Sequence, residues 1–202
     1  MTLNPLLNLD VVELRDRLAS GAVRAVEYAE ACLDRIAALE PEIQAWAYLD
    51  GDYVLAQARA LDARRQSGMP IGPLHGLPVG LKDVIDTARM PTENGTPLDK
   101  GRVPTEDAVL VEKLRAAGAI IMGKTVSTEM AFMCPSKTHI PHTGGIIGRI
   151  GGGGCRGDGA VGRGDANRWV GHPAGIVLWC GRVKADLWRD FPYRGLGPVT
   201  VA

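Results

Sequence analysis

The sequence predicts an α/β fold built on a mixed sheet over residues 1–140, followed by a disordered or irregular Gly-rich tail over residues 141–202. Two patterns support the predicted α/β fold of residues 1–140. Apolar residues recur at helical spacing in four segments, and two short apolar runs flank the last of those segments. The tail is different: it has neither helical nor strand periodicity, and it holds 16 of the 26 Gly, three of the four Trp and no Ser. Glycine at this density costs backbone entropy and offers little to pack.

The first part divides into helices and strands in a definite order. Helices are expected over residues 11–19, 24–39, 53–66 and 107–117, with Gly21 and Pro41 ending the first two. Residues 77–81 and 119–122 are apolar runs typical of buried strands. Because the fourth helix separates these two runs, they are expected to form a crossover unit in a parallel or mixed sheet.

Composition excludes several classes of function. Lys+Arg and Asp+Glu balance at 23 each, so there is no basic surface for nucleic acid. No stretch is long and apolar enough to span a membrane, and the N-terminal segment carries charges where a secretion signal needs an apolar run. The four cysteines are scattered without metal-ligand spacing. These features favour a reduced, cytoplasmic protein.

One lysine stands out by its context. Lys82 ends the predicted strand over 77–81, within GPLHGLPVGLKDVID. A lone lysine there is ordinarily a strand-end side chain that reaches water, because lysine is almost never buried unpaired. The blocks that follow alter this interpretation: MPTENGTP (residues 90–97) and EDAVLVEKLRAAGAIIMGKTVSTEMAF (residues 106–132) come in order and at specific spacing.

Together these blocks, over about residues 5–138, resemble the amidase signature family. The resemblance implies a hydrolase of amide C–N bonds that uses a Ser–cis-Ser–Lys triad and no metal or organic cofactor. In that family the lysine of LKD is the general base and must be neutral to accept a proton, and it acts through a relay serine on a nucleophilic serine. The match assigns Lys82 to the base, and it gives Thr125 and Glu129 structural roles near the site.

The two serine loops that the family requires are missing from this chain, since its last serine is Ser136. Reading the codons one base over from Pro141 permits a peptide that contains both GGSS and TGGS. A Trp codon, TGG, must become a Gly codon in that frame, and the three tail tryptophans fall where the family pattern has Gly. The relay serine would come from the codon of Ile146 and the nucleophile from the codon of Val170. The hypothesis is a frameshift near codons 139–141, by mutation or by sequencing error.

Two functions therefore remain open. The chain is an amidase-family hydrolase by lineage, expected to be inactive because both catalytic serines are missing, or it is a non-catalytic truncated fragment or interaction protein. If the chain is an amidase-family hydrolase, the resemblance implies a small amide as substrate. It also allows a homo-oligomer, because helical segments like residues 11–39 often pack against a partner in the family.

Overall fold

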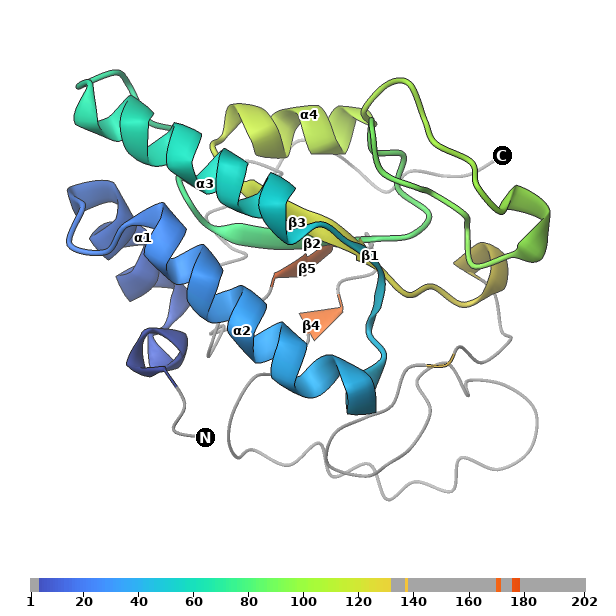
Figure 1. Cartoon of the computed structure of the whole chain (residues 1–202). Helices are drawn as coiled ribbons and strands as arrows, with labels where there is room; N and C mark the ends of the chain where they lie inside the picture. The colour runs from blue at the N-terminus through green and yellow to red at the C-terminus, as the bar shows by residue number, and fades with distance from the viewer. Residues whose placement is uncertain (1–3, 132–136, 138–169, 172–175, 179–202) are drawn as a thin grey trace.

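The structure is a computed structural model that describes residues 4–131, 137, 170–171 and 176–178. A mixed five-stranded sheet in the order β1–β3–β2–β5–β4 organises these residues (Figure 1). β2 and β3 are parallel, whereas the other neighbouring pairs are antiparallel. The strands are β1 (Trp46–Leu49), β2 (Pro78–Lys82), β3 (Ile120–Thr125), β4 (Val170–Gly171) and β5 (Ile176–Leu178).

In the described part of the chain, four α-helices accompany the sheet, and each overlaps a predicted helix: α1 (Val11–Ser20), α2 (Ala25–Ile43), α3 (Gly51–Gln66) and α4 (Val109–Ala116). The same ranges contain the short 3₁₀ helices η1 (Pro5–Asn8), η2 (Pro97–Asp99) and η3 (Glu129–Ala131). Since α4 connects the parallel strands β2 and β3, the predicted strand–helix–strand unit is confirmed.

The sheet separates two apolar cores. Alternate side chains of β3 point to opposite faces, as in any strand: Ile120 and Met122 join the core formed with α1, α2 and α3, whereas Ile121 joins the core formed with α4. Val79 and Leu81 of β2 belong to the second core and are fully buried. Figure 1 shows α2 and α3 running side by side across the sheet. Lys82 therefore extends from a strand that is fixed by this packing.

The predicted end of α2 at Pro41 is wrong, because the helix continues to Ile43. A proline removes one backbone donor, and so close to the helix end this loss affects only the last turn. Two other contacts terminate the helix. Gln44 adopts a left-handed conformation (φ 53°) and donates its N–H to the carbonyl of Glu40. The Glu40 carboxylate then accepts the N–H groups of Ala45 and Trp46 at 3.1 and 2.9 Å, which joins α2 directly to β1.

Two regions depart from the predicted pattern. The sequence does not predict β1, because its four residues are too few to show an alternation between the end of α2 and the start of α3. In the tail, expected to be irregular, the described residues form the short strands β4 and β5, and β5 pairs with β2. The remainder of the tail lies outside the described residues.

A side-chain amide completes the edge of β3. Ile120 donates its N–H to Leu77 on the β2 side, so the N–H and C=O of Ile121 point the other way, beyond the end of β1 at Leu49. Gln57 of α3 satisfies both groups. Its Oε1 accepts the Ile121 N–H at 3.1 Å, and its Nε2 donates to the Ile121 carbonyl at 3.0 Å. The helix thus replaces a neighbouring strand at this point.

Asp62 and His75 are two buried polar residues with different surroundings. The carboxylate of Asp62 accepts the N–H groups of Ala25 and Val26 at 2.8 and 3.1 Å, so a side chain of α3 caps the N-terminus of α2. His75 is 2% exposed, and neither ring nitrogen has a hydrogen-bond partner among the described residues. Burial is the main cause that lowers the pKa of His75, and the Arg65 guanidinium lowers it further while Asp62 opposes both.

Candidate functional site

Lys82 is the last residue of β2, as its motif predicts. It lies opposite Thr125 in the parallel register, between fully buried Leu81 and nearly buried Asp83. The Lys82 side chain is half-buried, and its Nζ makes no hydrogen bond or ion pair with any residue that the structure describes. The strand end thus presents a lysine whose amine is available to a group from outside the described part of the chain.

The backbone on both sides of Lys82 is held by hydrogen bonds. Leu81 accepts the Thr125 hydroxyl at 3.4 Å, and Asp83 donates its N–H to the Thr125 carbonyl at 3.0 Å. A tight turn then reverses the chain, with the Ile85 N–H donating to the Lys82 carbonyl at 2.9 Å. These contacts fix the direction in which the lysine side chain leaves the strand.

Asp83 connects the strand end to the NGTP loop. Its carboxylate accepts the backbone N–H of Glu93 at 3.3 Å, and its carbonyl accepts the N–H of Asn94 at 2.9 Å. Gly95 has φ +65°, and a Cβ there would lie 2.8 Å from the Ser127 carbonyl oxygen, so the loop requires glycine at this position. Burial raises the pKa of Asp83, while the Lys124 ammonium, 3.7 Å away, acts in the opposite direction.

Lys124 is the fully buried lysine of this region. Its Nζ donates to the Ile85 carbonyl at 2.6 Å and to the Thr92 hydroxyl at 2.5 Å. Burial lowers the pKa of Lys124 to about 8, against the opposing effect of Asp83. A lowered pKa is common for catalytic lysines, but this side chain has 0% exposure and its donors are already engaged. A substrate or relay group therefore has no access to it.

Glu129 and Thr125 take part in local contacts. Glu129 accepts the Thr96 hydroxyl at 2.9 Å, which joins η3 to the NGTP loop. Thr125 forms the contacts with β2 described above. Ser136 and Ile146, by contrast, lie outside the described residues. Val170, whose codon would give the nucleophile, lies in β4, and the structure places no serine hydroxyl on Lys82 within its described ranges.

The sequence pattern singles out Lys82 and misses the network beneath it, formed by Asp83, Thr92 and Lys124. The available signal is Lys124 itself, a charged residue at the end of the apolar run IIMGK. An unpaired lysine is almost never buried, so its presence in a buried strand points to acceptors nearby, although it does not identify them.

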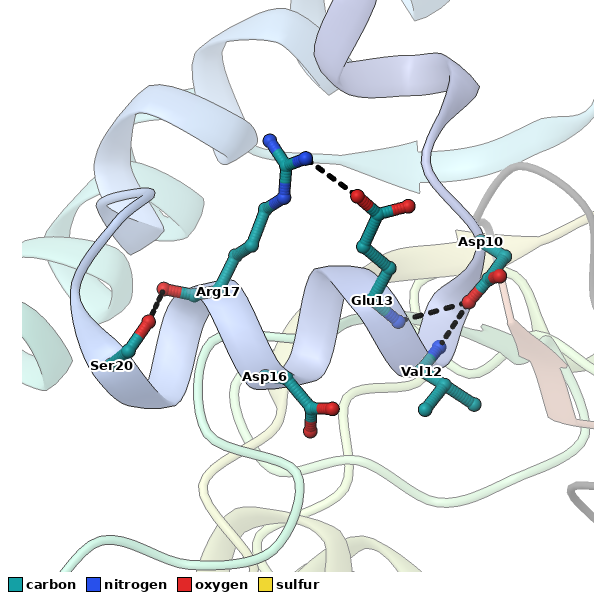
Figure 2. A pocket seen from close by; sticks show the side chains of 6 residues that line it. All are labelled: Asp10, Val12, Glu13, Asp16, Arg17 and Ser20. Atoms are coloured by element: carbon teal, nitrogen blue, oxygen red, sulfur yellow. Dashed lines mark hydrogen bonds and ion pairs between the residues drawn. The ribbon is translucent and has the colours of Figure 1, made fainter.

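The described surface also contains a hollow on α1, lined by Asp10, Val12, Glu13, Asp16, Arg17 and Ser20 (Figure 2). Figure 2 shows helix contacts at several of its polar groups: the Asp10 carboxylate accepts the N–H groups of Val12 and Glu13, and Arg17 pairs with Glu13. None of these residues belongs to the LKD, NGTP or GKT blocks. We therefore assign no chemical role to this hollow.

The described residues contain neither a metal-ligand cluster nor a membrane-spanning helix. Within those ranges, no group of three or more His, Cys, Asp or Glu side chains could hold a metal ion. No helix in the same ranges is long and apolar enough to cross a membrane.

Comparison with known proteins identifies the family. The Amidase family model matches residues 27–143. The A subunit of glutamyl-tRNA(Gln) amidotransferase from Chloroflexus aurantiacus is 45% identical over 124 residues, which is 61% of this chain and 26% of that protein. Its counterpart from Acidothermus cellulolyticus is 43% identical over 129 residues, or 64% of this chain and 26% of the relative.

A solved structure gives the same result. Native peptide amidase from Stenotrophomonas maltophilia superimposes with a TM-score of 0.60 at 38% identity, over 67% of this chain and 28% of that one. The chain thus spans about a quarter of the length of the relatives it matches. Because the family model covers more than half of the sequence, and the LKD strand end and the NGTP loop lie within the matched range, the chain belongs to the amidase family.

Proposed function

We propose that this chain carries the general-base portion of an amide C–N hydrolase, with Lys82 as the base. The observation that supports this most directly is that Lys82 is half-buried at the end of a strand fixed on both sides, and that its Nζ has no partner among the described residues. Family membership supports the reaction class.

The chemistry assigned to Lys82 follows from its amine. In its neutral form it accepts a proton from a relay serine, and the relay serine takes one from a nucleophilic serine, which attacks the carbonyl carbon of the amide. The C–N bond then breaks, and the amine leaves with the proton that Lys82 took up through the relay serine. Water then hydrolyses the acyl-serine, which releases the carboxylic acid and restores the serine. Backbone N–H groups of a Gly-rich loop would stabilise the oxyanion. No cofactor is required by this scheme.

We further propose that the chain as written is inactive, because residues 141–202 are an out-of-frame tail that replaces the two serine loops. The absence of serine after Ser136 supports this. The family match also supports it, since the match ends at residue 143, close to the start of the tail. The amidase portion would then comprise residues 1–140.

Two measurements test these proposals. Purified protein is incubated with aliphatic and aromatic amides, and no turnover is expected; turnover that disappears in Lys82→Ala would overturn the proposed inactivity. The DNA across codons 138–190 is also resequenced. Codons that forbid GGSS or TGGS in the shifted frame would refute the frameshift. If the frame is restored, the protein should hydrolyse amides, and Lys82→Ala should reduce kcat by about 10²–10⁴-fold.

Substrate, partners and location are parts of the same proposal. With the frame restored, the substrate would be a small carboxamide, and the protein is proposed to be cytoplasmic. Its helical N-terminal segment favours self-association, and the curated relatives are named as one component of an amidotransferase. Sedimentation velocity at several concentrations tests self-association, and a monomer at every concentration would argue against it.

A second candidate is a non-catalytic fragment or interaction protein. Exposed apolar side chains favour it, since Leu98, Val109 and Met130 are 92%, 64% and 62% exposed. Hydrogen exchange distinguishes a partial domain from a complete one. Protection confined to residues before 138 supports the fragment, whereas protection through the tail would show that the tail folds.

A further inference from the structure

The ammonium of Lys124 joins β3 to three separate points of the segment that follows Lys82. It contacts Ile85 in the turn, Thr92 in the next stretch of loop, and Asp83 directly beside Lys82, at 2.6, 2.5 and 3.7 Å. Thr92 also donates its hydroxyl to the Ile85 carbonyl at 3.4 Å, so two of the three points contact each other. One side chain therefore closes the segment 83–92 against the sheet.

Packing alone does not explain a lysine here. A buried charge loses its hydration, and an apolar side chain of similar volume would fill the same space without that penalty. The ammonium group provides directional contacts that an apolar side chain lacks, because one donor group holds three acceptors at defined positions. The segment so held begins at the residue that follows Lys82 and includes the turn that comes after it.

We propose that Lys124 is a positioning residue for Lys82. Its ammonium fixes Asp83 and Ile85, and through them the backbone from which the Lys82 side chain extends. The proposal rests on the function proposed for Lys82. It assigns Lys124 no contact with substrate, because the side chain is fully buried.

The test observes Lys82 directly and needs no catalysis. Surface lysines of the full chain are ¹³C-dimethylated, and the Lys82 signal is assigned in the NMR spectrum with Lys82→Arg. The wild-type Lys82 signal should be separate from that of exposed Lys100. In Lys124→Met it should move to the position of the exposed lysines, whereas Lys100→Met, the matched control, should leave it unchanged.

A second variant covers the risk that Lys124→Met fails to fold. Thr92→Val keeps the ion pair and the volume but removes one acceptor, so a smaller displacement of the Lys82 signal is expected while the other lysine signals stay in place. An unchanged Lys82 signal in either folded variant would overturn the proposal, as would a wild-type signal that coincides with Lys100. Failure of the amide assays would instead bear on the role of Lys82 as a base.

Discussion

Replacing Gln57 with Leu should destabilise the fold by leaving the backbone of Ile121 unsatisfied. The Gln57 amide makes hydrogen bonds of 3.1 and 3.0 Å to the N–H and C=O of this fully buried residue. Each buried backbone group left without a partner costs about 1–3 kcal/mol. The leucine regains about 1 kcal/mol through apolar burial. We therefore expect the free energy of unfolding to fall by about 2–3 kcal/mol, which lies within the range set by the two unsatisfied backbone groups.

Gln66 provides a matched control for this substitution. It is the last residue of the same helix and is exposed, so Gln66→Leu removes the same amide without touching β3. Urea unfolding followed by far-ultraviolet circular dichroism gives both free energies, and surface changes of this kind usually stay within about 0.5 kcal/mol. Hydrogen exchange at the Ile121 amide reports on the bond itself.

The reasoning would be refuted if Gln57→Leu and Gln66→Leu unfolded at the same urea concentration with equal slopes. The same conclusion would follow if the Ile121 amide exchanged as slowly in Gln57→Leu as in the wild type. Either result would mean that the edge of β3 finds another partner when the side-chain amide is removed.

Three further substitutions follow from the same structure. Asp62→Ala removes the cap of α2 and should cost about 1–2 kcal/mol in thermal unfolding, against little change for exposed Asp34→Ala; equal losses would contradict the capping role. Gly123→Ala places a Cβ 2.2 Å from a β1 carbonyl oxygen and should cost about 2–3 kcal/mol, whereas Gly51→Ala, with ordinary contacts at 3.7 Å, should be tolerated in the same assay. For His75, the lowered folded pKa means that stability is present above the unfolded value of 6.5 and is lost as pH falls through the folded pKa. His75→Leu should therefore reduce the slope of unfolding free energy against pH on the acid side by up to about 1.4 kcal/mol per pH unit. Parallel curves for the wild type and the variant between about pH 7 and pH 4 would contradict this.

Local patterns are sufficient to predict the helices and the parallel strand pair. The apolar residues at helical spacing in α2 lie in one core, and the apolar runs on either side of α4 form buried strands. Both patterns are visible in a single sequence. Pro41 misleads the prediction because the helix end is not set by the proline. The Glu40 carboxylate accepts the N–H groups of Ala45 and Trp46 at the start of β1, and this contact is not visible in helix propensity. The position of Lys82 at a strand end is predictable for the same local reason.

The network around Lys82 could not be predicted in this way. Lys124, Thr92 and Asp83 meet only because β3 returns parallel to β2 after a long connection. No spacing rule links residues so far apart, and the charge of Lys124 alone would suggest an exposed position. The role of Lys82 itself remains a prediction, which the assays above can test.

The parallel pairing of β2 with β3 also bears on the order of folding. Helices α2 and α3 pack against each other and are separated only by residues 44–50, so their first contacts close a short loop. The strand pair must instead close the whole connection from Asp83 to Ala119, and loop closure of this kind slows folding. We expect the helical layer to form first and β2 to remain unpaired for longer, with Val79 and Leu81 transiently exposed. Pulse-labelling hydrogen exchange should then protect α2 before β3, and simultaneous protection of the two would contradict this order.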